Sequence, residues 1–85
     1  MDKLDKLDYA LLDFMNVHSA ITKMSAVTRK AILSELDINY NTLCRRLSKL
    51  ISKGYANTGT PESREQTYYI TEDGKKAFKE AINER

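Results

Sequence analysis

Apolar residues recur along this chain at the spacing of amphipathic helices in four segments. The segments are residues 3–17, 29–36, 40–53 and 72–83, and each combines an apolar stripe with charged or amide side chains. In the first segment the stripe has positions three or four apart, at Leu4, Leu7, Leu11, Phe14 and His18. The pattern therefore predicts a mainly helical domain.

Residues at the ends of the two central segments predict where their helices start and stop. Thr28 and Asn39 are good N-cap residues, because their side-chain oxygen accepts from a free backbone N–H in the first turn. Residues 37–39 form a tight turn between the two helices, and Gly54 is suited to end the second one. The sequence thus predicts a helix-turn-helix over residues 28–53.

The helix predicted from Tyr40 to Lys53 has two distinct faces. At 100° per residue, Leu43, Leu47 and Leu50 fall within an arc of about 60°, which is expected to face the core. The opposite face carries only polar side chains, those of Asn41, Arg45, Ser48 and Ser52.

Strand-forming residues follow the helix-turn-helix. Residues 55–58 and 67–70 are rich in Tyr, Thr and Ile, and the turn formers of residues 59–63 lie between them. This arrangement predicts a β-hairpin. The hairpin carries three tyrosines, Tyr55, Tyr68 and Tyr69. Their side chains are expected either to fill the core or to stack on bases.

The loop 18–27 is expected to end in a short strand at Ala26–Val27, with Ile21 and Met24 anchoring it on the core. The elements then follow as helix, short strand, helix, helix, β-hairpin and helix. This order predicts an α+β, mainly α, winged helix-turn-helix fold. A single domain is expected over residues 1–85, with a helix-turn-helix at 28–53, a wing at 55–70 and terminal helices at 3–17 and 72–83.

Positive charge is concentrated in the helix-turn-helix. The whole chain has a formal net charge of +2, whereas residues 28–53 hold six basic side chains against two acidic ones, an excess of four. Fields of exposed charges decay over roughly 8–10 Å at physiological salt, so this local excess governs phosphate attraction. A basic, exposed helix suits the major groove of double-stranded DNA. The alternative interpretation is a solvated basic face without a ligand.

The composition gives little support to other classes of function. No apolar run approaches the ~20 residues that span a bilayer, and the N-terminus lacks the basic and apolar regions of a signal peptide. The sequence has one histidine, His18, and one cysteine, Cys44, which are too few for a structural zinc. No enzymatic activity, metal or cofactor is therefore expected, and a reducing cytoplasm is the expected location. A redox-sensitive Cys44 and a Cys–His catalytic pair are the weaker alternatives.

Two fragments resemble parts of the MarR-type and PadR-type transcriptional regulators. Residues 42–54, TLCRRLSKLISKG, are similar to the recognition-helix pattern of these families. Residues 62–74, ESREQTYYITEDG, resemble the end of their wing and the start of the helix after it. The resemblance covers about residues 28 to 78 and implies a DNA-binding winged helix. The chain is shorter than a typical MarR-type protein, and its wing tip has a single basic residue, Arg64, between two acids.

The predicted recognition helix supplies the candidate DNA contacts. Asn41 and Arg45 lie one turn apart on its outer face, and their side chains can bond adenine and guanine bidentately. Further candidates, which would hold phosphates and set the register of the helix, are Asn39, Tyr40, Thr42, Arg46, Lys49 and, in the wing, Arg64. Arg46 lies nearer the core edge, where it is expected either to pair with an acid or to reach a phosphate.

The terminal helices carry more apolar surface than one small core needs, which predicts a homodimer built from residues 3–17 and assisted by 72–83. Tyr9 and Leu12 are the preferred contacts because they lie outside the main stripe. The full set of expected interface residues is Leu4, Leu7, Tyr9, Leu12, Phe78 and Ile82. A two-fold dimer would read two half-sites about one DNA turn apart.

The sequence therefore predicts sequence-specific binding of double-stranded DNA by a small, homodimeric, repressor-like transcriptional regulator. Two alternatives stay open. One is a winged-helix module that binds protein with the same surface, which would lack the steep salt dependence of DNA binding. The other is a replication or partition accessory factor of a plasmid or phage, which needs the same DNA contacts as a repressor.

Overall fold

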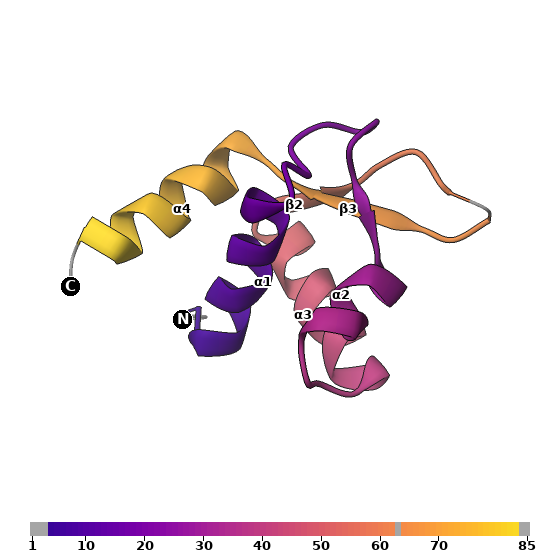
Figure 1. The fold of residues 1–85 in the computed structure, drawn as a ribbon. Helices are drawn as coiled ribbons and strands as arrows, with labels where there is room; N and C mark the ends of the chain where they lie inside the picture. The colour runs from indigo at the N-terminus through magenta and orange to yellow at the C-terminus, as the bar shows by residue number, and fades with distance from the viewer. Residues whose placement is uncertain (1–3, 63, 84–85) are drawn as a thin grey trace.

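A computed structural model describes residues 4–62 and 64–83. The elements are α1 (Lys6–Val17), β1 (Val27–Thr28), α2 (Arg29–Glu35), α3 (Tyr40–Ser52), β2 (Ala56–Thr58), β3 (Thr67–Ile70) and α4 (Glu72–Asn83). Figure 1 shows α1, α2 and α3 gathered below the sheet, with the β2–β3 hairpin reaching out on one side and α4 leaving on the other. The element order expected of a winged helix-turn-helix is confirmed.

The sheet is antiparallel, with the strand order β1-β3-β2. Val27 pairs with Tyr68, and Ala56 pairs with Ile70, so the central strand β3 ties the hairpin to the segment before α2. The short strand β1 lies one residue later than the sequence pattern predicts.

A capping box starts α1 later than expected. The Asp5 carboxylate accepts from the backbone N–H of Asp8 at 3.1 Å, and the Asp8 carboxylate accepts from the backbone N–H of Asp5 at 3.0 Å. Asp5 is therefore the N-cap and the helix begins at Lys6, not at residue 3, which itself lies outside the described residues. The apolar periodicity that includes Leu4 and Leu7 placed the start of the predicted helix too early, because the spacing of apolar residues carries no information about helix caps.

The core lies where α1, α2 and α3 meet the sheet. Leu43, Leu47 and Leu50 are 0–1% exposed, so the predicted facing of the recognition helix is confirmed. Other fully buried apolar side chains come from α1, α2 and β3, namely Leu11, Leu12, Met15, Ile32 and Ile70.

Two expectations about the packing of apolar residues were wrong. Leu12 was expected to lie outside the main stripe and to reach a second subunit, yet it is fully buried in this chain's own core. The reason is that α1 packs against both α4 and β3, so its buried arc is wider than one stripe. Ile21 and Met24 do not anchor the loop before β1, because both are exposed; Ala20 is buried instead, and its carbonyl accepts from the N–H of Ile70 at 2.8 Å.

Glycines allow two tight features around the recognition helix. Gly54 follows α3 with a φ of +80°, and the N–H groups of Gly54 and Tyr55 bond back to the carbonyls of Ile51 and Leu50. This Schellman motif confirms the predicted helix end. Gly74, in the first turn of α4, lies so close to the Tyr55 carbonyl that a Cβ would come within 2.0 Å of its oxygen. Within residues 4–62 and 64–83, no helix has the length and apolarity that crossing a membrane requires.

Candidate nucleic-acid interface

The outer face of α3 is polar and open. Asn41, Arg45, Ser48 and Ser52 are all exposed, as their position opposite the buried leucines requires. Tyr40, at the start of the helix, is 51% exposed. In the described part of the chain, Arg45 takes part in no ion pair, so its guanidinium remains available to a ligand.

Asn39 has a structural role at the start of α3. Its side-chain oxygen accepts from the backbone N–H of Thr42 at 2.8 Å, which makes it the predicted N-cap. The side chain therefore fixes where the recognition helix begins, and Tyr40 and Asn41 follow directly in the first turn.

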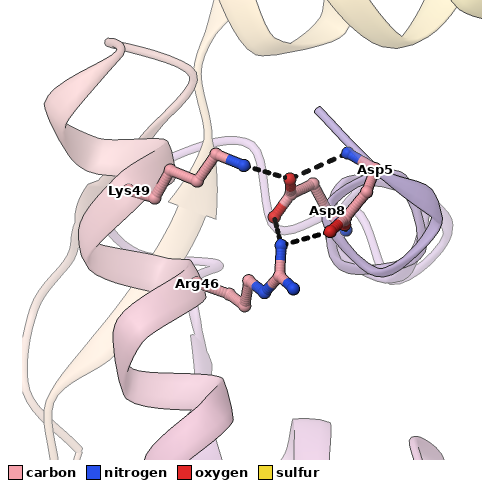
Figure 2. A network of polar contacts seen from close by, with 4 residues as sticks. All are labelled: Asp5, Asp8, Arg46 and Lys49. Atoms are coloured by element: carbon pink, nitrogen blue, oxygen red, sulfur yellow. Dashed lines mark hydrogen bonds and ion pairs between the residues drawn. The ribbon is translucent and has the colours of Figure 1, made fainter. Parts of the chain in front are cut away.

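On the flank of α3 that faces α1, two basic side chains meet two acidic ones (Figure 2). The Lys49 Nζ lies 2.8 Å from the Asp8 Oδ2. The Arg46 Nη1 lies 2.5 Å from the Asp5 Oδ2 and 3.4 Å from the Asp8 Oδ1. Asp8 is fully buried, and the side chains of Lys49 and Arg46 are 26% and 30% exposed. Of the two outcomes expected for Arg46, the structure shows the pairing with an acid.

The network shifts the ionisation of its members. The pKa of the Asp5 carboxyl is lowered, mainly because the backbone N–H of Asp8 donates to it and with a further contribution from the Arg46 guanidinium. The hydrogen bond to Asp5 in turn raises the pKa of Arg46. Two of the six basic residues of the helix-turn-helix thus have their charge matched by acids that lie outside it in the sequence.

Beside the other flank of α3, an arginine from α2 lies over two tyrosine rings. The Arg29 guanidinium, at the start of α2, lies 5.2 Å from the Tyr40 ring centroid and 5.9 Å from that of Tyr68. Its Nη1 is also 3.8 Å from the Cys44 Sγ. Burial alone would lower the pKa of Arg29, but Tyr68, Tyr40 and Cys44 together outweigh it and the pKa is raised. The stack links α2, α3 and β3 beside the exposed face.

The charged side chains of the wing tip are two acids and one arginine. Glu62 and Glu65 pair backbone to backbone across the hairpin, and Arg64 between them is exposed with a φ of +70°. A groove between α2 and the wing is lined by Arg29, Lys30, Leu33, Tyr40, Glu65 and Gln66. Of the two interpretations of the wing tyrosines, Tyr68 fits the core-filling one, because it is 7% exposed and its burial raises its pKa.

His18 and Cys44 lie in different environments. His18 stacks on Phe14 at the end of α1, with ring centroids 4.3 Å apart, whereas Cys44 is half-buried beside Arg29. In the part of the chain that the structure describes, no three His, Cys, Asp or Glu side chains gather closely enough to hold a metal ion.

Sequence reasoning missed Asp5, Asp8 and Arg29 as parts of this site. The spacing of Asp5 and Asp8 is that of a capping box, with Asp in the place of the usual Glu, so a signal for the cap was present. Nothing in the sequence pattern indicated that these acids would face Arg46 and Lys49, or that Arg29 would lie over two tyrosine rings.

Comparison with solved structures finds TubR from Bacillus megaterium pBM400. The two chains are 28% identical with a TM-score of 0.85, and the match covers 94% of this chain and 88% of that chain. No protein-family model matches the sequence, and no curated protein matches it. The MarR-type or PadR-type subdivision therefore stays a prediction. The winged-helix fold itself is shared with TubR over almost the whole chain.

Proposed function

We propose that this protein binds double-stranded DNA with the outer face of α3 in the major groove. The single observation that carries the proposal is the exposed Asn41–Arg45 face on a winged helix whose core and caps hold the helix rigidly. A major groove admits an α-helix, and bidentate contacts from Asn and Arg can read its bases. The similarity to TubR, a DNA-binding regulator of plasmid partition, supports the same function.

The residues have different roles in this proposal. Asn41 and Arg45 read bases, because they point away from the core one turn apart. Tyr40 and Thr42 contact the phosphate backbone near the start of the helix, and Asn39 contributes by capping it. Arg64 adds at most one phosphate contact, since the neighbouring Glu62 and Glu65 oppose an approach of the wing tip to DNA.

A homodimer is the assembly we propose, with a second copy of the chain on the surface between α1 and α4. A groove there is lined by Lys6, Tyr9, Ala10, Asp13, Phe78 and Ile82. Ile82 is 48% exposed although its side chain is apolar, and Leu4, Leu7, Tyr9 and Phe78 are only partly buried. Covering this surface would remove apolar area from water, and a two-fold arrangement would present two recognition helices to one duplex.

The biological role is that of a repressor-like transcriptional regulator or that of a plasmid partition factor. In either role the protein acts in the cytoplasm, where its target DNA lies. The first follows from the MarR-type and PadR-type resemblance of residues 42–54 and 62–74. The similarity to TubR favours the second. Both roles use the same contacts, so the DNA-binding proposal does not depend on which is correct.

Selection from a pool of random duplexes tests the proposal. The protein should enrich a defined sequence, and methylation of guanines in the major groove of that sequence should interfere with binding. A pool that stays unenriched at low salt would contradict the proposal. Capture of a protein partner by the same face, without any duplex bound, would favour the interaction module instead.

A further inference from the structure

Arg46 and Lys49 lie one turn apart on a flank of α3, not on its outer face. When a helix enters the major groove, its outer face meets bases and its flanks run beside the phosphate backbones. Cations on a flank contact phosphates in any sequence, so they strengthen specific and non-specific binding alike. In this chain, however, both flank cations already have carboxylate partners from α1.

The carboxylates are held rigidly in place. Asp5 and Asp8 form the capping box of α1, in which each carboxylate accepts from the backbone N–H of the other residue. Asp8 is fully buried, and removing its cations would leave an uncompensated charge inside the protein, which is strongly destabilising. A DNA phosphate would therefore have to compete with a fixed, desolvated carboxylate for Lys49.

We propose that Asp5 and Asp8 are specificity-determining residues that withhold Arg46 and Lys49 from DNA phosphates. The two acids lower the affinity for arbitrary sequences, while Asn41 and Arg45 on the outer face keep their contacts to bases. They also hold the helix by its flank, so they act as positioning residues and touch no base themselves. This inference rests on the proposed DNA-binding function and identifies which cations of the recognition helix take part in it.

Counterion release predicts how much the salt dependence of binding should change. Each cation that neutralises a phosphate adds about 0.9 to the slope of log affinity against log salt. Releasing one flank cation should therefore steepen the slope by about one, and releasing both by about two. Between 50 and 200 mM salt, each released cation changes the relative affinity about three- to fourfold.

The variants Asp5→Asn, Asp8→Asn and their combination test this prediction. Asn is as good an N-cap as Asp at position 5, and at position 8 it keeps an oxygen that can accept the backbone N–H of residue 5, so each variant removes a charge and can retain the capping box. Asp73→Asn is the matched control, since it makes the same charge change on an exposed residue of α4 that joins no ion pair among the described residues and does not line the groove between α1 and α4. The readout is fluorescence polarisation with a labelled duplex of random sequence over a range of salt concentrations.

The double variant should bind this duplex more tightly than wild type at low salt, with a steeper salt dependence, and Asp73→Asn should match wild type. The ratio of affinities for the selected and the random duplex should fall. Equal slopes for wild type and the double variant would overturn the inference; Asp5→Asn alone leaves Arg46 its 3.4 Å contact with Asp8, so it should steepen the slope by less than one. If Asp8→Asn does not fold, Asp5→Asn carries the test, because its side chain is 49% exposed and the loss of its charge leaves no buried ion unpaired.

Arg46→Gln supplies the reciprocal measurement. Introduced alone, Arg46→Gln should leave the slope of log affinity against log salt nearly unchanged. Combined with Asp5→Asn, it should abolish the steepening that Asp5→Asn causes. A slope that falls by about one in Arg46→Gln, as expected for a cation on a phosphate, would overturn the inference and leave the DNA-binding function standing. Failure of the wild-type protein to bind any duplex at low salt would instead overturn both.

Discussion

The Asp8 carboxylate on α1 accepts a hydrogen bond from the Lys49 ammonium on α3, at 2.8 Å and across 41 residues of sequence. Asp8 has no exposed surface and the Lys49 side chain is 26% exposed, so this contact ties the recognition helix to a buried carboxylate of the N-terminal helix. The same carboxylate contacts Arg46 and accepts from the N–H of Asp5, which joins the helix cap and the flank of α3 in one network (Figure 2). The orientation of the proposed DNA-reading face therefore depends on residues far from it in sequence.

Arg45→Ala should weaken binding to the selected duplex and relax the preference at one base position. A bidentate base contact contributes about 1–3 kcal/mol of discrimination, so specific affinity should fall roughly 5- to 150-fold. Lys76→Ala on α4 removes the same charge from an exposed site away from α3, and it should have little effect. Equal losses in the two variants, measured by fluorescence polarisation, would mean that Arg45 acts through net charge alone.

Leu47→Ala should destabilise the fold severely. Leu47 is 1% exposed, and truncating a buried leucine typically costs about 2–5 kcal/mol in the free energy of unfolding. Val17→Ala truncates an apolar side chain that is 68% exposed, and its effect should stay within about 0.5 kcal/mol. Urea unfolding followed by circular dichroism compares the two, and similar midpoints would show that the assigned facing of α3 is wrong.

Gly74→Ala should destabilise the protein more than Gly54→Ala. At Gly74 the new methyl group would lie 2.0 Å from the Tyr55 carbonyl oxygen, so α4 has to move away from the end of α3. Such overpacking costs typically about 1–3 kcal/mol, and a 2.0 Å approach to a backbone oxygen belongs at the upper end of that range. At Gly54 the space is open and only the positive φ opposes alanine, which costs roughly 1–2 kcal/mol. The reverse order of the two melting temperatures would contradict the close approach of α4.

Acidification should remove part of the stability that the Asp5 carboxylate contributes to the folded protein. Its pKa in the folded protein is lowered, chiefly by the N–H of Asp8, so its contribution is fully present above the unfolded-state value of about 3.9 and is lost as the pH falls through the folded value. The side chain is half exposed, which makes the effect small. Asp5→Asn should therefore lose less stability than wild type between about pH 4 and pH 2 in urea titrations. Parallel losses would show that the ionisation of Asp5 is not linked to folding.

Ile82→Lys should shift the protein toward the monomer in sedimentation equilibrium. The change places a charge on the exposed apolar surface between α1 and α4, where the second copy is proposed to bind. Because the side chain is 48% exposed in the single chain, the fold should tolerate it. Lys79→Glu changes the charge at an exposed position of the same helix, so it tests whether a change of charge alone alters assembly. A wild-type mass of one 9.8 kDa chain at micromolar concentration would contradict the dimer.

Local patterns in the sequence predict the helices and their facing well. Leu43, Leu47 and Leu50 share one arc of a helix whatever surrounds it, and the outer position of Asn41 and Arg45 follows from the same geometry. Thr28, Asn39 and Gly54 act on their own neighbours, so their capping roles were also predictable. These features need only the helical repeat and backbone hydrogen bonding.

Contacts between distant segments were beyond the reach of these patterns. The burial of Leu12 depends on how α4 and β3 cover α1, and the pairing of Lys49 with Asp8 depends on the angle between α1 and α3. The same is true of Arg29, which stacks on tyrosines from two other elements. Because Arg46 and Lys49 pair with acids of α1, the charge excess counted over residues 28–53 is larger than the net positive charge of the recognition helix and its partners.

The salt dependence of wild-type binding to the selected duplex tests the central claim most directly. The claim predicts binding at low salt and a linear fall of log affinity with log salt, with a slope close to 0.9 for each phosphate neutralised. Arg45 should account for a measurable part of that slope, and the flank cations Arg46 and Lys49 should not. A duplex that is not bound at about 50 mM salt, where electrostatic attraction is strong, would contradict the assignment of α3 as a DNA-reading helix.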